Sequence, residues 1–418
     1  MNVSTNTFPN ILRILVILGI IGFGGAHLRL IPVQAAVPES AVLLHQGHLK
    51  YEGSFRTPSG PIGGSNFGYA MTVAAYNPVN DSLFLVGHDY QQMVAEVSIP
   101  NPVITTEEST LPIATVLQPF VDPSEGKMYT VDDGKINMGG LLVLNNKLYG
   151  TAYDYYDADK SQVLSHFSSS LNLSEQGDAQ GMFKLNVALA GTVSGYMGLI
   201  PLEWQVAFGG PALTGNCCIS IISRSSYGPA AFVFNPDDLG QKNPVPATPL
   251  VYYPETHPLD QWGEESAIFN GTSEIHGVVF PHDSRTVLFF GIHGVGPFCY
   301  GTPTECNDPI GDYKGNHAYP YVTQIWAYDA LDLLKAKNGE VNPWEVSPYE
   351  TWRIQLPFAP TTYKSKIGGA YDPATQRVFV PEYREGNTLM VHVFKLTHGS
   401  GGSSDTTPPV AVQGLTVD

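Results

Sequence analysis

Two stretches of the chain align without a gap over twelve residues: Ala75-Tyr-Asn-Pro-Val-Asn-Asp-Ser-Leu-Phe-Leu-Val86 and Ala370-Tyr-Asp-Pro-Ala-Thr-Gln-Arg-Val-Phe-Val-Pro381. Each is typical of a strand, a turn and a second strand, because Asn or Asp before Pro favours a turn and the flanking apolar runs favour β structure. Apolar runs on both sides of a polar turn return at 141–149 and 278–290. Such recurrence indicates a repeat architecture.

Further apolar runs supply a third and a fourth strand after most of these hairpins. The chain then divides into five units at roughly 60–120, 138–190, 193–254, 274–357 and 365–396. The last unit lacks an outer strand, and the segment 41–50 can supply it and so remove a free sheet edge. The pattern resembles a β-propeller, a ring of radial four-stranded sheets. We predict an all-β propeller over 40–396 with five blades, six or seven being the alternative, closed by this N-terminal strand.

The units exceed the usual length of propeller repeats, and we expect the excess to be insertions. These lie at 120–136, 200–216, 297–320 and 334–350. Asp329 as N-cap and Gly339 just past the end predict a short helix between them. Three Gly-Gly pairs, at 63–64, 139–140 and 368–369, are expected on inner strands, where backbones crowd around a central channel.

Composition excludes several classes of protein. The 43 Gly and 33 Pro argue against a long-helix or coiled-coil protein, and 43% hydrophobic residues argue against a disordered chain. The formal net charge of −17 argues against nucleic acid as a partner, because such proteins carry a basic surface. No Walker loop and no Gly-x-Ser-x-Gly elbow is present.

Residues 1–35 are predicted to be a secretory signal peptide. Arg13 precedes an almost wholly apolar run, 14–23, and Ala35 offers a small residue before a cleavage point. A single membrane anchor is the alternative, but the run is shorter than the ~20 residues that span a bilayer. No later stretch is long and apolar enough, so we expect a secreted, periplasmic or cell-surface monomer without a transmembrane span after signal removal.

The end of the chain differs in composition from the propeller. Residues 397–407 are rich in Gly, Ser and Thr and are predicted to form a flexible linker. Residues 408–418 resemble the opening strand of a fibronectin type III domain. Together with the propeller pattern, this tail resembles exported bacterial β-propeller proteins that are sometimes followed by fibronectin-like modules. That resemblance supplies no activity.

Four cysteines in an exported chain permit disulfides. Cys299 and Cys306 flank a loop rich in Gly and Pro, and we predict that they pair. Cys217 and Cys218 are adjacent, and their state stays open between a bond to each other, other partners and free thiols.

The loops that join the second and third strands of propeller blades share one face with the segments that lead into each blade, and this face often binds ligands. Here that face carries aromatic, acidic, His and Arg residues. The predicted ligand-binding residues are His88, Asp89, Tyr90, Tyr153, Asp154, Tyr155, Arg224, Tyr227, His276, His293, Glu382 and Arg384. Asn66 and His317 lie in segments expected at the same face. Such a set favours a glycan or another small polar ligand.

A glycoside hydrolase or lyase is the alternative, because two carboxylates can cleave a glycosidic bond. The catalytic candidates are Glu274, Asp154 and Asp89. The chain partly resembles five-bladed glycosidases, which place an acid on the inner strand of the first blade; the matching segment 64–70 has Asn66 and no acid. Glu274 does match the usual position of the acid, so the sequence does not decide whether the protein is an enzyme.

No metal is required by the sequence, and calcium is the cation that its loops would suit. Asp132, Asp133, Asp157 and Asp159 place carboxylate oxygens in two loops, although neither loop is an EF-hand. A calcium-stabilised interaction scaffold on a cell surface or in the matrix is therefore the third functional hypothesis.

Overall fold

The computed structural model describes residues 38, 41–218, 225–386 and 388–397. The predicted signal peptide and the fibronectin-like strand lie outside these residues, as does all but Thr397 of the predicted linker. Within the described part of the chain, no helix is long and apolar enough to cross a membrane.

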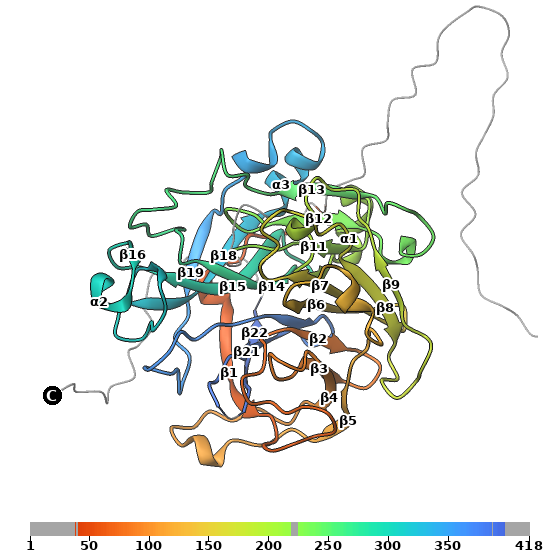
Figure 1. Cartoon of the computed structure of the whole chain (residues 1–418), viewed down its shortest axis with the longest axis horizontal. Helices are drawn as coiled ribbons and strands as arrows, with labels where there is room; N and C mark the ends of the chain where they lie inside the picture. Colours follow the sequence, from red (N-terminus) through yellow and green to blue (C-terminus); the bar gives the residue numbers. More distant parts are fainter. Residues whose placement is uncertain (1–37, 39–40, 219–224, 387, 398–418) are drawn as a thin grey trace, which may run out of the picture. The chain divides into compact units, whose positions relative to one another are not determined.

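Five four-stranded antiparallel sheets form the blades of a β-propeller (Figure 1). Blade 1 contains β2 (Ala74–Asn77), β3 (Ser82–Val86), β4 (Val94–Ser98) and β5 (Val116–Val121). Blade 2 contains β6 (Ile136–Leu144), β7 (Lys147–Asp154), β8 (His166–Ser170) and β9 (Gln180–Phe183). Blade 3 contains β10 (Met197–Leu199), β11 (Ala212–Thr214), β12 (Ala231–Phe234) and β13 (Ala247–Val251). Blade 4 contains β14 (Glu274–Val279), β15 (Thr286–Gly294), β18 (Tyr321–Asp329) and β19 (Glu350–Arg353).

Blade 5 combines the two ends of the described chain. It contains β20 (Ala370–Asp372), β21 (Arg377–Glu382), β22 (Met390–Leu396) and, as its outer strand, β1 (Leu49–Arg56). Figure 1 shows β1 beside β22, and their register runs from Leu49 opposite Leu396 to Arg56 opposite Met390. The predicted closure by an N-terminal strand is confirmed, but the strand is 49–56 and not 41–50. Residues 49–56 pair with β22 along the strand, and Phe55 among them is fully buried in the core between blades 5 and 1.

The inner strands contact one another in the order β2, β6, β10, β14, β20 and back to β2, which closes the ring. Backbone crowding there is confirmed for two of the Gly pairs. A Cβ added to Gly139 would lie 2.1 Å from Ser194 O, and one added to Gly368 would lie 2.0 Å from Thr72 O. The pair at 63–64 lies in the loop before β2 instead, near Phe120 and Met93.

The segment 64–70 was expected to include the first inner strand, and this prediction is wrong. The inner strand of blade 1 is β2. Within 64–70, Asn66 Oδ1 accepts a hydrogen bond from Gly68 N at 2.7 Å, so Asn66 stabilises a turn. Its position therefore says nothing about a catalytic acid.

The helices occupy the connections between strands. They are α1 (Leu202–Phe208), α2 (Pro303–Cys306) and α3 (Ala330–Lys337). Short 3-10 turns lie at η1 (Gln46–His48), η2 (Glu108–Thr110), η3 (Lys127–Thr130), η4 (Ala190–Thr192), η6 (Pro236–Asp238) and η7 (Pro343–Glu345). The predicted short helix is confirmed as α3. Asp329 is its N-cap, as predicted, and the Asp329 side chain accepts a hydrogen bond from Leu331 N at 2.9 Å.

The prediction that residues 200–216 form an insertion is wrong, because they contain both α1 and the second strand of blade 3, β11. Trp204 of α1 is fully buried, and its indole N–H donates to Ser284 O at 2.9 Å. The helix therefore joins blade 3 to blade 4. The insertion 297–320 is confirmed: it separates β15 from β18 and contains a small hairpin, β16 (Cys299–Gly301) and β17 (Gly315–His317).

Candidate functional site

The candidate site is built around Glu274, the first residue of the inner strand β14. His276 lies two residues further along, and its Nε2 is 3.2 Å from Glu274 Oε2. Lys366 belongs to the segment that leads into β20, and its Nζ is 2.7 Å from the same oxygen. One carboxylate oxygen thus binds two basic side chains from neighbouring blades. We call Glu274, His276 and Lys366 the charged centre.

The charged centre is open to solvent, since the side chains of Glu274 and Lys366 are 24% and 38% exposed. Burial opposes ionisation of Glu274, but Lys366 and His276 outweigh it and hold the pKa of Glu274 well below its ordinary value. Burial likewise opposes the charge of Lys366, but Glu274 raises the pKa of Lys366 above its ordinary value. Both groups are therefore ionised at neutral pH.

Lys364 adds a second ammonium group. Its Nζ donates to the Tyr313 hydroxyl and lies 4.8 Å from the centroid of the Tyr313 ring and 4.2 Å from that of Tyr321. Burial and the like charge of Lys366 lower the pKa of Lys364, although Glu274 opposes this. Lys364 and Lys366 were not among the predicted site residues. The signal that could have found them is the stretch Lys364-Ser-Lys366 just before the Gly pair 368–369.

Residue Ser365, between the two lysines, is tied to the body of blade 5. Its hydroxyl donates to Glu382, which is fully buried and lies 3.2 Å from Nε2 of the equally buried His392. Glu382 was predicted to bind ligand. The structure instead places it behind the site, where it fixes the segment that carries Lys364 and Lys366.

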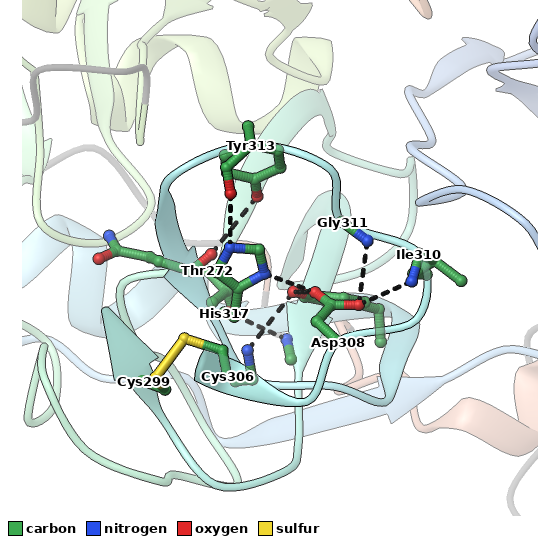
Figure 2. A network of polar contacts seen from close by, with 12 residues as sticks. Thr272, Cys299, Cys306, Asp308, Ile310, Gly311, Tyr313 and His317 are labelled. Atoms are coloured by element: carbon green, nitrogen blue, oxygen red, sulfur yellow. Dashed lines mark hydrogen bonds and ion pairs between the residues drawn. A yellow bond between two sulfur atoms is a disulfide. The ribbon is translucent and has the colours of Figure 1, made fainter. Parts of the chain in front are cut away.

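The insertion in blade 4 supplies Tyr313 and contains a buried Asp308–His317 pair (Figure 2). Figure 2 shows His317 between Tyr313 and Asp308, with His317 Nδ1 2.6 Å from Asp308 Oδ2 and both side chains fully buried. Tyr321 donates to the same carboxylate oxygen at 2.6 Å, and the backbone N–H groups of Ile310 and Gly311 donate to the other. His317, expected at this face, therefore supports the loop.

The disulfide between Cys299 and Cys306 lies in the same insertion, as predicted. It connects β16 to the last residue of α2, two residues before Asp308. The Tyr313 ring stacks on the His317 ring with centroids 5.0 Å apart. The disulfide, the Asp308–His317 hydrogen bond and the ring stacking together fix Tyr313 beside Lys364.

A third lysine, Lys135, lies just before the first strand of blade 2. Lys135 Nζ is 2.8 Å from Asp89 Oδ2 and lies over the rings of Tyr90 and Tyr155, at 5.6 and 5.5 Å from their centroids. Tyr155 also interacts electrostatically with Lys366 and with Tyr313. The predicted residues Asp89, Tyr90 and Tyr155 are thus brought together, and Tyr155 links them to the charged centre.

Tyr153 lies in β7, two residues before Tyr155, and is buried. Burial raises the pKa of Tyr153 to about 12, while Asn137 and Lys366 act in the opposite direction. Asp154 between them is structural: its Oδ1 accepts from Tyr156 N at 2.9 Å, and its carboxylate packs where a Cβ of Gly134 would lie. Asp154 is therefore not positioned as a catalytic acid.

Several other predicted ligand-binding residues hold loops together. The ring of His88 lies 5.3 Å from that of Tyr90, and His88 Nδ1 accepts from Tyr90 N. Tyr227 packs edge-on against Trp262, with centroids 5.0 Å apart. Arg384 donates to Phe358 O and Glu108. Fully buried His293 contacts Ser273 and Ser266 O. Arg224 lies outside the described residues.

Three of the four predicted metal-binding aspartates converge on one hydroxyl. Ser161 Oγ donates to Asp132 at 2.5 Å and lies 3.3 Å and 3.2 Å from Asp157 and Asp159. Asp133 contributes its backbone N–H to Asp132. Among the described residues, no group of three His, Cys, Asp or Glu side chains has the arrangement of a metal site. The geometry at these aspartates is that of a hydrogen-bonded loop.

Cys217 and Cys218, whose state the sequence left open, form a disulfide with each other. Cys217 also forms a β-bridge with Ile275, which separates Glu274 from His276 on β14. The adjacent disulfide therefore lies against the strand that carries the charged centre.

The arrangement can hold charged and hydroxyl groups between cations and aromatic rings. An ionised Glu274 suits a base, a nucleophile or a ligand-binding group, whereas a glycosidase acid needs a raised pKa. Asp89 is paired with Lys135, and Asp308 is buried with His317. Of the three catalytic candidates, Asp89 and Asp154 are engaged in other contacts, and Glu274 is the one that belongs to the charged centre.

No family model and no curated protein matches the chain. Among solved structures, it is similar to one described under the GH130 family of mannoside phosphorylases, with glycoside hydrolases that target β-1,2 mannosidic linkages in Candida mannan (10% identity, 89% of this chain, 99% of that chain, TM-score 0.42). It is also similar to an exo-1,5-α-L-arabinanase from a bovine ruminal metagenomic library (10% identity, 81% of this chain, 98% of that chain, TM-score 0.42). A third similar structure is a luciferin-regenerating enzyme (9% identity, 79% of this chain, 78% of that chain, TM-score 0.33). At these values the likenesses carry no argument about activity.

Proposed function

We propose that the protein is an exported propeller that binds a glycan at the charged centre. The observation that carries this proposal is the meeting of Lys366 and His276 on one partly exposed carboxylate, Glu274. Paired charges of this kind bind sugar hydroxyls through charge-assisted hydrogen bonds. Tyr155 and Tyr313 border the centre, and aromatic rings offer apolar faces on which sugar rings can stack.

The geometry gives each group a role. Glu274 accepts hydrogen bonds from hydroxyl groups, and Lys366 donates to them. The Tyr313 ring is held by His317, so little conformational entropy is lost when a ligand binds against it. The blade-5 anchor, Glu382 with Ser365, keeps Lys366 in place without contacting the ligand.

The test is a glycan-array screen of the secreted protein, followed by calorimetry with the best ligand. The variant Glu274→Gln keeps the shape of the side chain and removes its charge, and we expect it to weaken binding at least tenfold. Glu340→Gln, on the exposed loop after α3, is the matched control and should bind as the wild type does. Equal binding by wild type and Glu274→Gln would overturn the assignment of the site.

Incubation with each bound oligosaccharide separates binding from hydrolysis. We expect the ligand to be recovered intact. Cleavage products that disappear in Glu274→Gln would instead identify Glu274 as a catalytic residue and the protein as a glycoside hydrolase or lyase.

Export is part of the proposal and rests on the apolar run 14–23 after Arg13. Expression of the full chain in a bacterial host, followed by mass spectrometry of the secreted or periplasmic protein, tests it. We expect a mature N-terminus close to Ala36. Recovery of the intact N-terminus in the membrane fraction would favour a membrane anchor.

A further inference from the structure

We infer that the glycan carries an anionic group, a carboxylate or a sulfate, and that Lys364 and Lys366 bind this group together. This inference rests on the proposed function and names the class of its ligand. It concerns the side of the charged centre that faces the blade-4 insertion.

The balance of charge at the site favours an anionic ligand. Two ammonium groups, Lys364 and Lys366, stand beside one carboxylate, Glu274. The next carboxylate, Asp308, is fully buried and already paired with His317. The charged centre and Lys364 together therefore carry more lysine than carboxylate charge, although the chain as a whole has a net charge of −17. A cationic spot on an acidic protein attracts an anionic group selectively.

The partners of Lys364 also favour an anionic ligand. Within the described ranges, its ammonium group contacts the Tyr313 hydroxyl and the faces of Tyr313 and Tyr321, and it makes no ion pair with a carboxylate. Rings and a hydroxyl stabilise a cation less than an anion does, and a partly buried cation is costly without a counter-charge. An anionic group of the ligand supplies that counter-charge.

Both lysines are preorganised for binding. Lys364 and Lys366 are two residues apart, and Ser365 between them is bound to buried Glu382. The Tyr313 and Tyr321 side chains that contact Lys364 are held by His317 and Asp308. Both lysines are thus presented by fixed supports, which lowers the entropy cost of binding.

Calorimetry with matched oligosaccharides tests the inference. The probes are oligogalacturonate and its fully methyl-esterified form, and a sulfated galactan oligosaccharide and its desulfated form. We expect at least one charged probe to bind, and its uncharged partner to bind at least tenfold more weakly. Which charged probe binds decides between a carboxylate and a sulfate.

The variant Lys364→Gln should lose at least tenfold affinity for the charged probe, and Lys364→Arg should retain most of it. Lys335→Gln, exposed on α3, is the control, and thermal melting confirms that each variant is folded. Equal affinity for charged and uncharged partners, or unchanged binding by Lys364→Gln, would overturn the inference alone. Failure of every glycan on the array and of all four probes would instead remove the proposed function.

Discussion

Glu274 Oε2 lies 2.7 Å from Lys366 Nζ, so one ion pair joins the inner strand of blade 4 to the segment that leads into blade 5. Both side chains are partly exposed, and water screens their attraction. The pair therefore fixes the geometry of the charged centre more than it stabilises the fold.

Replacing Glu274 by Gln should lower the free energy of unfolding at pH 7 by about 1 kcal/mol, the upper range for exposed ion pairs. The pKa of Glu274 is lowered in the folded state, so the stability it contributes is present above its ordinary value of 4.5 and is lost as the pH falls below it. Urea unfolding at pH 7 and at pH 3 measures the difference. The difference in free energy of unfolding between wild type and variant should be smaller at pH 3 than at pH 7. A larger difference at pH 3 would contradict the assigned ion pair.

Closure of the ring depends on β1, and Phe55 is its buried anchor. Phe55 is fully buried among residues of blades 1 and 5. Phe55→Ala should lower the free energy of unfolding by about 3–5 kcal/mol, because it leaves a cavity in a packed core. Lys50→Ala, an exposed position on the same strand, should change it by less than about 0.5 kcal/mol. Chemical denaturation measures both, and similar effects at the two positions would show that β1 does not close the ring.

The sequence predicted the blades because their signals are local. An Asx-Pro turn between apolar runs requires only neighbouring residues, and Ala75 and Ala370 begin the same hairpin in blades 1 and 5. The closing strand was misplaced because 41–50 and 49–56 both contain apolar residues. The two are distinguished by the pairing of 49–56 with β22, which joins residues that are far apart in the sequence.

The candidate site was predicted only in part, because residue type does not reveal burial. His276 does belong to the charged centre, and Asp89 and Tyr155 do meet at Lys135, whereas Glu382 and His293 are buried and hold loops. Lys366 was missed because its partner, Glu274, is far away in the sequence. Such a pair is visible only when the blades are arranged in a ring.

The buried pair Asp308–His317 should control the order of the blade-4 insertion. Asp308→Asn removes the negative charge of a carboxylate that contacts His317, Tyr321 and two backbone N–H groups. Breaking one partner of a buried pair typically costs about 3–5 kcal/mol. We expect faster proteolysis within 297–320 and weaker glycan binding, with the blades intact by circular dichroism. Unchanged proteolysis of that segment would contradict the supporting role of the pair.

The disulfide Cys299–Cys306 closes a small loop in the same insertion. In the chain-entropy model, closing a loop of this size lowers the conformational entropy of the unfolded chain and so stabilises the folded state by about 2–3 kcal/mol. The double variant Cys299→Ser/Cys306→Ser should therefore be less stable by up to that amount, as measured by thermal melting. The wild type under reducing conditions should approach the variant. A variant as stable as the oxidised wild type would show that the loop is held by Asp308 and His317 alone.

His166 should make the protein sensitive to acid. Its ring lies fully buried between blades 2 and 3, with Nδ1 2.8 Å from Ser165 Oγ and Nε2 3.0 Å from Thr214 Oγ1. Because Thr214 donates its own proton to Val193 O, it accepts from Nε2, and Nδ1 accepts from Ser165. Both nitrogens of the neutral ring are therefore hydrogen-bonded, and burial lowers the pKa of His166 to about 3.

The folded state keeps His166 neutral, whereas the unfolded state takes up a proton near the ordinary pKa of 6.5. The stability that neutral His166 contributes is therefore fully present above pH 6.5. It is lost as the pH falls toward 3, by up to about 1.4 kcal/mol per pH unit. His166→Gln should be less stable at pH 7 but lose less stability between pH 6.5 and 4. Urea unfolding across this range measures the slope, with exposed His257→Gln as the control. A slope equal to that of the wild type in His166→Gln would show that another group carries the acid sensitivity, and buried His293, whose pKa burial lowers to about 4, would be the next to replace.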